Sequence, residues 1–283
     1  MIRDYRCDRA ERMGIPAEAA QGFTFPTAYT DAKLLAELAV RRRKYSHAEM
    51  CILPFCHTLE AEAMGAHIRL DDGSPRAADP ICHTIDKLLA LPAIDLDAPR
   101  LCATLQACQL LHSEGETVAF AVSGPFTILN SLVDLGVVFR AMRKEPQKFE
   151  RLMSKLSDDI LQFICAVRDS GAELISYADS TATVGILGPK NMERITRDFT
   201  LPLLRKAEKS IGSEQMLVLC PKTTLALIDC GCADWHLHTL SRPMSYGEAC
   251  LAMRGEVKIG GQCCIQSADT VLMNRVFREI LLK

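Results

Sequence analysis

The sequence predicts an α/β protein of the (β/α)8 TIM-barrel type, in a single domain that covers residues 1–283. Two observations predict this class. Short apolar runs of strand length alternate along the chain with stretches of helical spacing, and polar or sulfur-containing side chains follow most of these runs. Alternation of this kind favours parallel strands, whose carboxyl ends lie together on one face of the sheet or barrel. A length of 283 residues suits one such domain.

Composition excludes several classes of partner. The net charge of −2 gives no basic field for nucleic acid, and no apolar run reaches the ~20 residues that span a membrane. The charged stretch at residues 1–9 contains no apolar signal segment, so we expect a cytoplasmic protein. The 13 cysteines are expected to be mostly free thiols that act as small core hydrophobes, with a few serving as ligands.

The strands and helices can be placed in order along the chain. Strands begin near residues 50, 117, 174, 215, 233 and 256. Helices are expected at about 31–45, 86–91, 101–113, 146–169, 189–212, 223–228 and 246–254. The longest has apolar residues at helical spacing and Gly171 as its stop signal. The residues up to Lys283 are expected to form the helix that follows the sixth strand.

A closed barrel of this type has eight strands, so the six readable units leave it incomplete. Residues before 30 contain no convincing strand, and residues 66–82 have no regular period. We therefore expect one or two strands to be missing or replaced. An open sheet edge invites pairing with another chain, which favours a homodimer.

Three acidic residues are candidates for catalysis. Asp179 directly follows an apolar run, and carboxylates at that position of a barrel usually serve function, so a functional role is favoured over a structural one. Glu60 and Glu62 are two residues apart on a helical turn and therefore point to different sides. One of them is expected to face the cavity, while the other caps the N-terminus of the helix.

Groups that bind soft metals follow the last three apolar runs. Cys220 ends the first of these runs, and Cys263 and Cys264 end the third. His236 and His238 share one face of the middle run, and His238 lies nearer its carboxyl end. We expect these groups at neighbouring strand ends. The alternatives are a buried core thiol for Cys220 and a hydrogen-bonded barrel histidine for His238.

Three blocks of the sequence resemble the methylcobamide:coenzyme M methyltransferases, a branch of the uroporphyrinogen decarboxylase superfamily. The first is Pro-Phe-Cys-His-Thr-Leu-Glu-Ala-Glu-Ala-Met-Gly at residues 54–65. The second and third are Ser-Gly-Pro-Phe-Thr at 123–127 and Ala-Asp-Ser-Thr-Ala at 178–182. The resemblance covers roughly residues 8–280, and the Glu-Ala-Glu-Ala block is its more specific part.

This resemblance implies a (β/α)8 barrel in which a Zn2+ ion converts a small substrate thiol into a thiolate. The thiolate then takes a methyl group from a corrinoid, a methylcobamide held on a partner carrier protein. Cys220 is implied as one zinc ligand, with His238 as a further candidate, while Val218 stands where the family has a histidine. The sequence stops at Lys283, before the segment that carries the family's last cysteine, and Cys263 or Cys264 is a candidate replacement.

The resemblance also places the methylcobamide at the barrel mouth, where His57, Gly124 and Ser180 are candidate contacts. An exposed loop histidine is an equal alternative for His57. The function that follows is a zinc-dependent methyltransferase that moves a methyl group between the corrinoid carrier and a small thiol. The alternative is a catalytically inactive barrel that binds the corrinoid or its carrier without chemistry, since Val218 replaces the family histidine.

Overall fold

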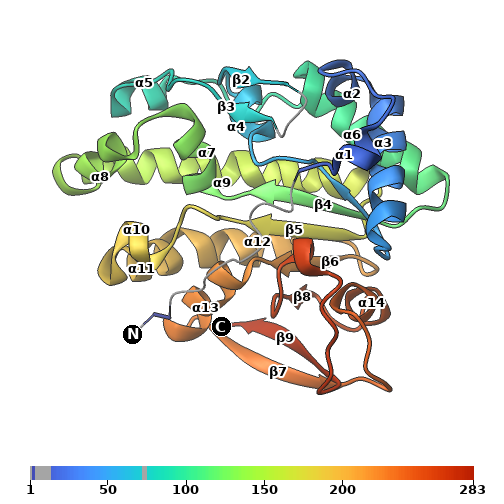
Figure 1. Ribbon diagram of the computed structural model, residues 1–283. Coiled ribbons are helices and arrows are strands. Elements are labelled where there is room, and N and C mark those ends of the chain that lie inside the picture. The colour runs from blue at the N-terminus through green and yellow to red at the C-terminus, as the bar shows by residue number, and fades with distance from the viewer. Residues whose placement is uncertain (1, 4–13, 72–74) are drawn as a thin grey trace.

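The computed structural model describes residues 2–3, 14–71 and 75–283 of the chain. Within them, seven strands form one sheet in the order β1-β4-β5-β6-β8-β9-β7 (Figure 1). These strands are β1 Cys51–Leu53, β4 Val118–Ser123, β5 Leu174–Ala178, β6 Met216–Leu219, β8 Ile259–Gly260, β9 Val276–Leu282 and β7 Ala233–Thr239. The first five in this order are parallel, while β9 is antiparallel to both β8 and β7. A separate antiparallel pair joins β2 Ile68–Arg69 to β3 Arg76–Ala77.

Helices connect the strands and cover the sheet. Those before β5 are α1 Ala17–Ala20, α2 Thr27–Thr30, α3 Ala32–Ser46, α4 Leu59–Ala63, α5 Ile85–Leu89, α6 Pro99–Ser113, α7 Pro125–Leu132, α8 Leu135–Lys144 and α9 Pro146–Asp169. Those after β5 are α10 Val184–Leu187, α11 Pro189–Ile195, the π-helical η2 Thr196–Thr200, α12 Leu201–Ser210, α13 Pro221–Asp229, α14 Tyr246–Ala252 and the 3-10 turn η3 Ile265–Ser267. None of the helices in the described part of the chain has the length and apolar content needed to cross a membrane.

The predicted α/β class, with a mostly parallel sheet of the barrel type, is confirmed, and each of the six predicted strands is present. The prediction for the C-terminus is wrong, because the last element is strand β9 rather than a helix. Its buried residues Phe277 and Ile280 are three apart, a spacing that also suits a helix. In the strand they point to opposite faces, and each is buried in a different hydrophobic core.

The expected position of β7 is also wrong. The sequence order suggests that β6, β7 and β8 lie side by side, but β8 pairs directly with β6 through Leu217 and Ile259. Strand β7 lies beyond β9 at the far edge of the sheet. Two antiparallel pairings in succession leave β7 pointing in the same direction as β6, yet separated from it by two strands, β8 and β9. Among the described strands the sheet is open, with β1 and β7 as its edges.

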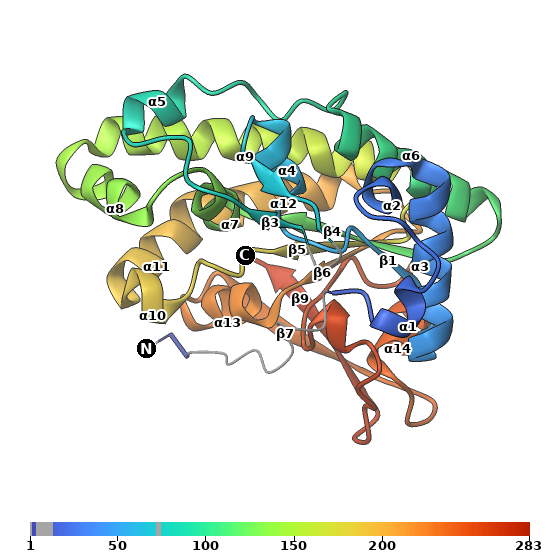
Figure 2. The same ribbon diagram turned by 45° about the horizontal axis from the view of Figure 1, so that its top comes forward.

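Hydrophobic cores lie on both faces of the sheet. Phe120 of β4 faces the connecting helices, where its ring packs edge-on against Phe163 of α9 at 5.8 Å. Met216 of β6 faces the other way, in a core that includes Tyr246 of α14 and Phe277 of β9. The rings of Tyr246 and Phe277 stack at 6.0 Å. Figure 2 shows α9 on one side of the sheet and α14 on the other.

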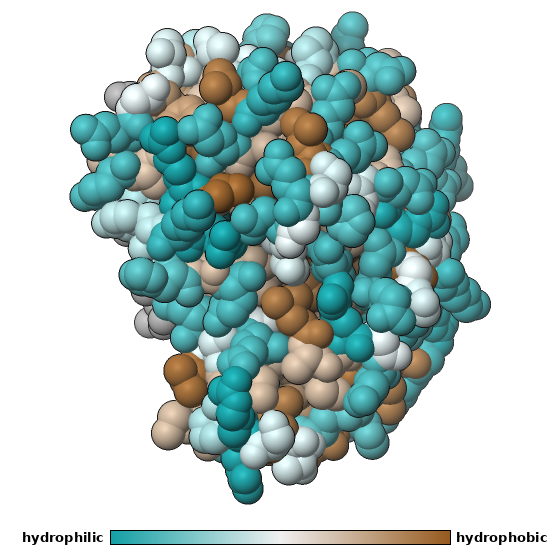
Figure 3. All heavy atoms as spheres, turned by 90° about the vertical axis from the view of Figure 1, so that its right-hand side faces the viewer, coloured by the Kyte–Doolittle hydropathy of each residue, from teal (hydrophilic) through white to brown (hydrophobic). Residues whose placement is uncertain are grey.

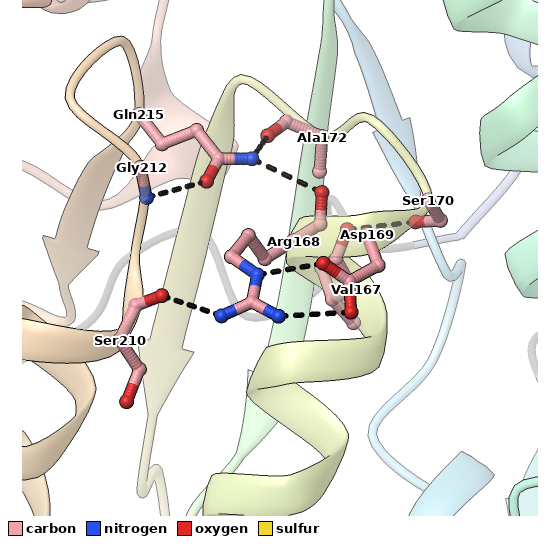
Figure 4. Close-up of polar contacts among 8 residues, drawn as sticks. All are labelled: Val167, Arg168, Asp169, Ser170, Ala172, Ser210, Gly212 and Gln215. Atoms are coloured by element: carbon pink, nitrogen blue, oxygen red, sulfur yellow. Dashed lines mark hydrogen bonds and ion pairs between the residues drawn. The ribbon is translucent and has the colours of Figure 1, made fainter.

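Polar contacts tie the amino ends of β5 and β6 to the preceding helices (Figure 4). The side-chain nitrogen of Gln215 donates to the carbonyl oxygens of Ala172 at 2.8 Å and Arg168 at 3.2 Å. The Gln215 side-chain oxygen accepts from the amide of Gly212 at 2.9 Å. Arg168 in turn donates to the carbonyl oxygen of Ser210 at 2.7 Å. At this end of a barrel such contacts usually serve stability rather than chemistry.

One face of the molecule is largely hydrophilic, and the cysteines agree with the expectation from composition. On the side that carries α3, α6 and α14, hydrophilic side chains predominate and hydrophobic areas are small and separate (Figure 3). All twelve described cysteines are free thiols, and eight of them are buried. Most therefore act as small core hydrophobes, as predicted.

Candidate active site at the carboxyl ends of the strands

The carboxyl ends of β1, β4, β5 and β6 lie next to one another, because these parallel strands are paired in that order. Ser123 at the end of β4 is paired with Ala178 at the end of β5. Gly124, Asp179 and Cys220, which follow β4, β5 and β6, therefore begin at one edge of the sheet. The structure gathers these predicted site residues in the region that the alternating sequence pattern indicated.

Both carboxylate oxygens of Asp179 accept hydrogen bonds from the first turn of α7. Its Oδ1 accepts hydrogen bonds from the backbone amide of Thr127 at 2.8 Å and from the Thr127 hydroxyl at 2.9 Å. Its Oδ2 accepts from the amide of Phe126 at 3.1 Å. Burial raises the pKa of Asp179 from 3.8 to about 6, while these hydrogen bonds oppose the rise. The carboxylate holds the N-terminus of α7 in place beside β5.

Because Gly124 has no side chain, Asp179 can occupy the space beside it. A Cβ atom on this glycine would lie 2.4 Å from the Cβ of Asp179 and 2.7 Å from the hydroxyl of Tyr177. The amide of Gly124 donates to the carbonyl oxygen of Ala178 at 2.9 Å, which fixes the close approach. Burial raises the pKa of Tyr177 well above its usual range, and its hydroxyl has no hydrogen-bond partner among the described residues.

Ser180 lies at the same edge and joins three elements. Its hydroxyl is 3.3 Å from that of Thr127, and its carbonyl oxygen accepts from Lys222 of α13 at 2.9 Å. The site therefore links the residues after β5 to the helices after β4 and β6. Contact of Ser180 and Gly124 with a methylcobamide stays a prediction.

Glu60 and Glu62 point to different sides of α4, as their spacing predicts. Glu60 is 1% exposed, and its Oε1 accepts from the amide of Ser123 at 2.6 Å. Burial raises the pKa of Glu60, and hydrogen bonds involving Ser123 oppose that rise. Glu62 instead forms an ion pair with Arg100 of α6. Glu60 thus fixes the end of β4 from within, and Glu62 ties α4 to α6.

Arg100 is a buried cation that the sequence reasoning missed. Its side chain is 5% exposed, and besides Glu62 it contacts the Cys56 sulfur at 3.2 Å and the Thr58 hydroxyl at 3.2 Å. These contacts fix the loop after β1, from which His57 projects. Only Pro99 before it gives a local signal, and that signal marks the first turn of a helix rather than a site.

His57 is half-buried rather than freely exposed. Burial lowers its pKa from 6.5 to about 4, so the imidazole is neutral at neutral pH. Its Nδ1 atom is enclosed and has no hydrogen-bond partner among the described residues. The burial of the side chain and the enclosed Nδ1 atom favour a position of His57 in the lining of the barrel mouth. They disfavour the alternative, an exposed histidine in a loop.

The predicted zinc ligands are only partly brought together. Cys220 follows β6, and Cys263 and Cys264 follow β8, so these thiols belong to the same end of two paired strands. His238 lies two strands farther on, where its Nε2 atom is 2.8 Å from an oxygen of Glu279. In the described ranges, no three of the four predicted ligands form a set close enough to share an ion. The donors present do not fit a complete zinc site of the family type.

Fold and site together define a class of protein: an α/β protein of the barrel type with a polar, partly buried site at the carboxyl ends of its strands. The chain belongs to the uroporphyrinogen decarboxylase (URO-D) family, whose sequence profile matches residues 15–240. This is the superfamily that the three sequence blocks indicate.

Comparison with similar proteins indicates one branch of this family. The chain is 27% identical over 234 residues to the methylcobamide:CoM methyltransferase MtaA of Methanosarcina barkeri, covering 81% of this chain and 67% of MtaA. It is 27% identical over 224 residues to the methylcobamide:CoM methyltransferase MtbA of Methanosarcina mazei, covering 74% of this chain and 63% of MtbA. The chain thus spans about two thirds of these relatives. They confirm the predicted resemblance to the methylcobamide:coenzyme M methyltransferase branch.

A solved structure supports the fold. A methyltransferase from Methanosarcina mazei superposes with a TM-score of 0.64 at 23% sequence identity, covering 86% of this chain and 74% of the other. At this identity the likeness bears on the fold alone. It agrees with the mostly parallel sheet and its surrounding helices.

Proposed function

We propose that the protein is a methyltransferase that moves a methyl group between a corrinoid and a small thiol. The observation that carries this proposal is the similarity to MtaA and MtbA, which extends over 81% and 74% of the chain. The conserved position of active sites in barrels of this type, at the carboxyl ends of the strands, supports placing the reaction beside Asp179 and Gly124.

The reaction balances without an external oxidant or reductant. When bound, the corrinoid would supply the methyl group to the thiolate sulfur as a methyl cation equivalent and would keep the electron pair of the bond that it loses. The thiol loses its proton, because the thiolate is the nucleophile.

The chain's own residues would shape and order the place where this exchange occurs. Asp179 holds the first turn of α7, and Glu60 holds the end of β4 through the amide of Ser123. Their carboxylate oxygens are bound to backbone amides, so we assign both a positioning role rather than proton transfer. Glu62 acts at greater distance, through Arg100 and the loop that carries His57.

The proposal also includes a requirement for zinc. Cys220 and one of Cys263 and Cys264 offer two thiolates from neighbouring strand ends, and thiolates are preferred zinc ligands. A bound Zn2+ would lower the pKa of a substrate thiol. Because the described residues supply no third ligand beside these thiols, the roles given above do not depend on the metal.

The test is a mixture of the purified protein, methylcobalamin and coenzyme M, with and without added Zn2+. We expect a thiol-dependent loss of the methylcobalamin absorbance that grows with enzyme concentration. Cys220→Ala is expected to abolish the part that requires zinc, while Cys230→Ala, a buried thiol before the amino end of β7, is the matched control. No thiol-dependent loss in either condition would refute the proposal.

A second candidate is a barrel that binds the corrinoid or its carrier without chemistry. It is favoured by Val218 at the position of the family histidine and by the pairing of His238 with Glu279. In that case methylcobalamin would bind, seen as a titratable change in its spectrum, and would persist in the presence of thiol.

Two further expectations belong to this proposal. The edge strands β1 and β7 offer backbone groups to another chain, so a homodimer is expected and light scattering would detect it. Free cysteines suit a reducing compartment, so we place the protein in the cytoplasm.

A further inference from the structure

Strands β7 and β9 form an antiparallel ribbon at the open edge of the sheet, and the ribbon brings three metal-binding side chains together. His236 is paired with Glu279 across the ribbon, and His238 is paired with Phe277. Directly paired residues point to the same face of a sheet, as do residues two apart along a strand. His236, His238 and Glu279 therefore share one face.

That face is the one that carries the smaller core, away from α9. Phe277, on the same face of β9, is buried in this core with Met216. Gly260 of β8 is paired with Glu279, so a residue without a side chain lies beside the carboxylate. The three groups stand on the side of the sheet opposite the helices that surround a barrel. The space beside Gly260 is filled by the Phe277 ring, which would lie 3.0 Å from a Cβ atom there.

The distances suit one ion after a small adjustment. The ligand atoms of His236, His238 and Glu279 all lie within 4.8 Å of one another, and the two imidazole rings are 4.8 Å apart at 83°. Zinc bonds to histidine nitrogen and carboxylate oxygen are about 2.0–2.2 Å long, which puts tetrahedral ligands about 3.3 Å apart. Side-chain ends therefore need to move by roughly 1 Å. His236 is exposed and has freedom to do so.

The chemistry of the set selects the kind of metal. Two imidazoles and one carboxylate suit zinc and other borderline transition metals, whereas calcium and magnesium prefer oxygen ligands. The nearby cations are directed elsewhere: Lys283 pairs with Asp234, and Arg278 lies over the Trp235 ring at 5.6 Å. Exposure of His236 leaves the fourth position open to water or a ligand.

We propose that His236, His238 and Glu279 form a zinc-binding site on the β7–β9 ribbon. The site uses two imidazoles and a carboxylate, and none of the cysteines expected from the family. It does not rest on the proposed methyl transfer. Through β9 and β8 it is connected to the strand that ends at Cys220, but it is a separate donor set.

The experiment titrates the metal-free full chain with Zn2+ and, separately, with Co2+. Calorimetry is expected to show zinc binding that weakens ~10-fold or more in His236→Ala and in Glu279→Gln, and that survives in Cys220→Ser. The exposed His83→Ala is the matched control and should bind as the parent does. In Cys220→Ser, bound Co2+ should show ligand-field bands without the intense thiolate-to-cobalt band in the near ultraviolet. Circular dichroism checks the fold of each variant.

Two outcomes would overturn the inference. Unchanged zinc affinity in both His236→Ala and Glu279→Gln would show that the ribbon holds no site. Complete loss of binding in Cys220→Ser, with a thiolate band for Co2+ in the parent, would assign the metal to the cysteines instead. Neither result depends on methyl transfer, so the ribbon site and the proposed function can fail separately.

Discussion

Thr127 donates two hydrogen bonds to the same oxygen of Asp179, one from its amide at 2.8 Å and one from its hydroxyl at 2.9 Å. Asp179 follows β5 and Thr127 is in the first turn of α7, so the pair joins two consecutive strand–helix units. The carboxylate therefore acts as the cap of a helix to which it does not belong. Both oxygens of this carboxylate are therefore used to hold the first turn of α7 beside the end of β5.

The buried state of Asp179 makes stability depend on pH. Its pKa rises from 3.8 to about 6 on folding, so between these values the folded protein holds a proton that the unfolded chain has lost. The contribution of Asp179 to the free energy of unfolding should therefore fall as pH rises through this window, by roughly 3 kcal/mol. Urea unfolding at pH 4 and pH 7 measures it by comparing variants: the change from pH 4 to pH 7 should be more positive in Asp179→Asn than in the parent, and the exposed Asp97→Asn should change as the parent does. Equal changes in Asp179→Asn and the parent would contradict the prediction.

His57 should produce the opposite dependence. Its pKa falls from 6.5 to about 4 on folding, so the unfolded chain binds a proton that the folded protein rejects between these values. Its contribution to stability is lost below pH 4 and regained as pH rises to 6.5, by roughly 3 kcal/mol. From pH 4 to pH 6.5 the change in the free energy of unfolding should be more negative in His57→Gln than in the parent, because the variant lacks this rise, while the exposed His83→Gln changes as the parent does. If His57→Gln changes with pH as the parent does, the imidazole is not enclosed in solution.

Gly124 should not tolerate a side chain. A Cβ atom there would overlap Asp179 at 2.4 Å, so Gly124→Ala must displace either α7 or the end of β5. We expect a loss of about 1–3 kcal/mol in the free energy of unfolding. Gly185→Ala is the matched control, because the nearest atom to its Cβ would be 3.9 Å away, at Thr183. That variant should unfold within about 1 kcal/mol of the parent. Equal losses in the two variants would mean that the overlap is relieved at no cost.

Removing one partner of the Glu62–Arg100 ion pair should lower the free energy of unfolding more than expected from a variant in which both partners are replaced. Glu62→Gln leaves a guanidinium that is 5% exposed without its carboxylate, and we expect a loss of about 3 kcal/mol. Replacing both residues, as Glu62→Gln with Arg100→Met, should cost less than the sum of the two single changes. Asp158→Asn in the exposed pair with Lys206 is the control and should change stability by less than about 1 kcal/mol. Additive losses in urea unfolding would argue against coupling.

The sequence predicts where the strands lie along the chain better than it predicts which strands pair in the sheet. Each apolar run predicted as a strand forms one, and β1, β4 and β6 are buried on both faces, whereas β7 is largely exposed. The position of β7 depends on β9, whose buried residues Phe277 and Ile280 have helical spacing but lie in different cores. Which strand pairs with which is decided by contacts between distant segments, and no local pattern encodes them.

In the candidate site, too, the sequence predicts local features but not contacts between distant segments. The spacing of Glu60 and Glu62 predicts that they face different sides, and the structure agrees. Their partners, Ser123 and Arg100, are 63 and 38 residues away in the chain, beyond the reach of spacing arguments. Thr127 lies inside a block that the sequence singles out, yet nothing local shows that its hydroxyl meets Asp179.

Gln215 offers a test of whether the amino ends of the strands serve stability alone. Its side chain joins Gly212 to the backbone of Arg168 and Ala172, which ties β6 to the end of α9 (Figure 4). Gln215→Ala removes one acceptor and one donor group that satisfy backbone atoms, so we expect a loss of about 1–2 kcal/mol in urea unfolding. The exposed Gln109→Ala, in α6, should change stability by less than about 0.5 kcal/mol. Methyl transfer by the folded Gln215→Ala protein should equal that of the parent, because the carboxyl-end site lies at the other end of the strands. A lower rate in the folded variant would show that the two ends of the sheet are coupled.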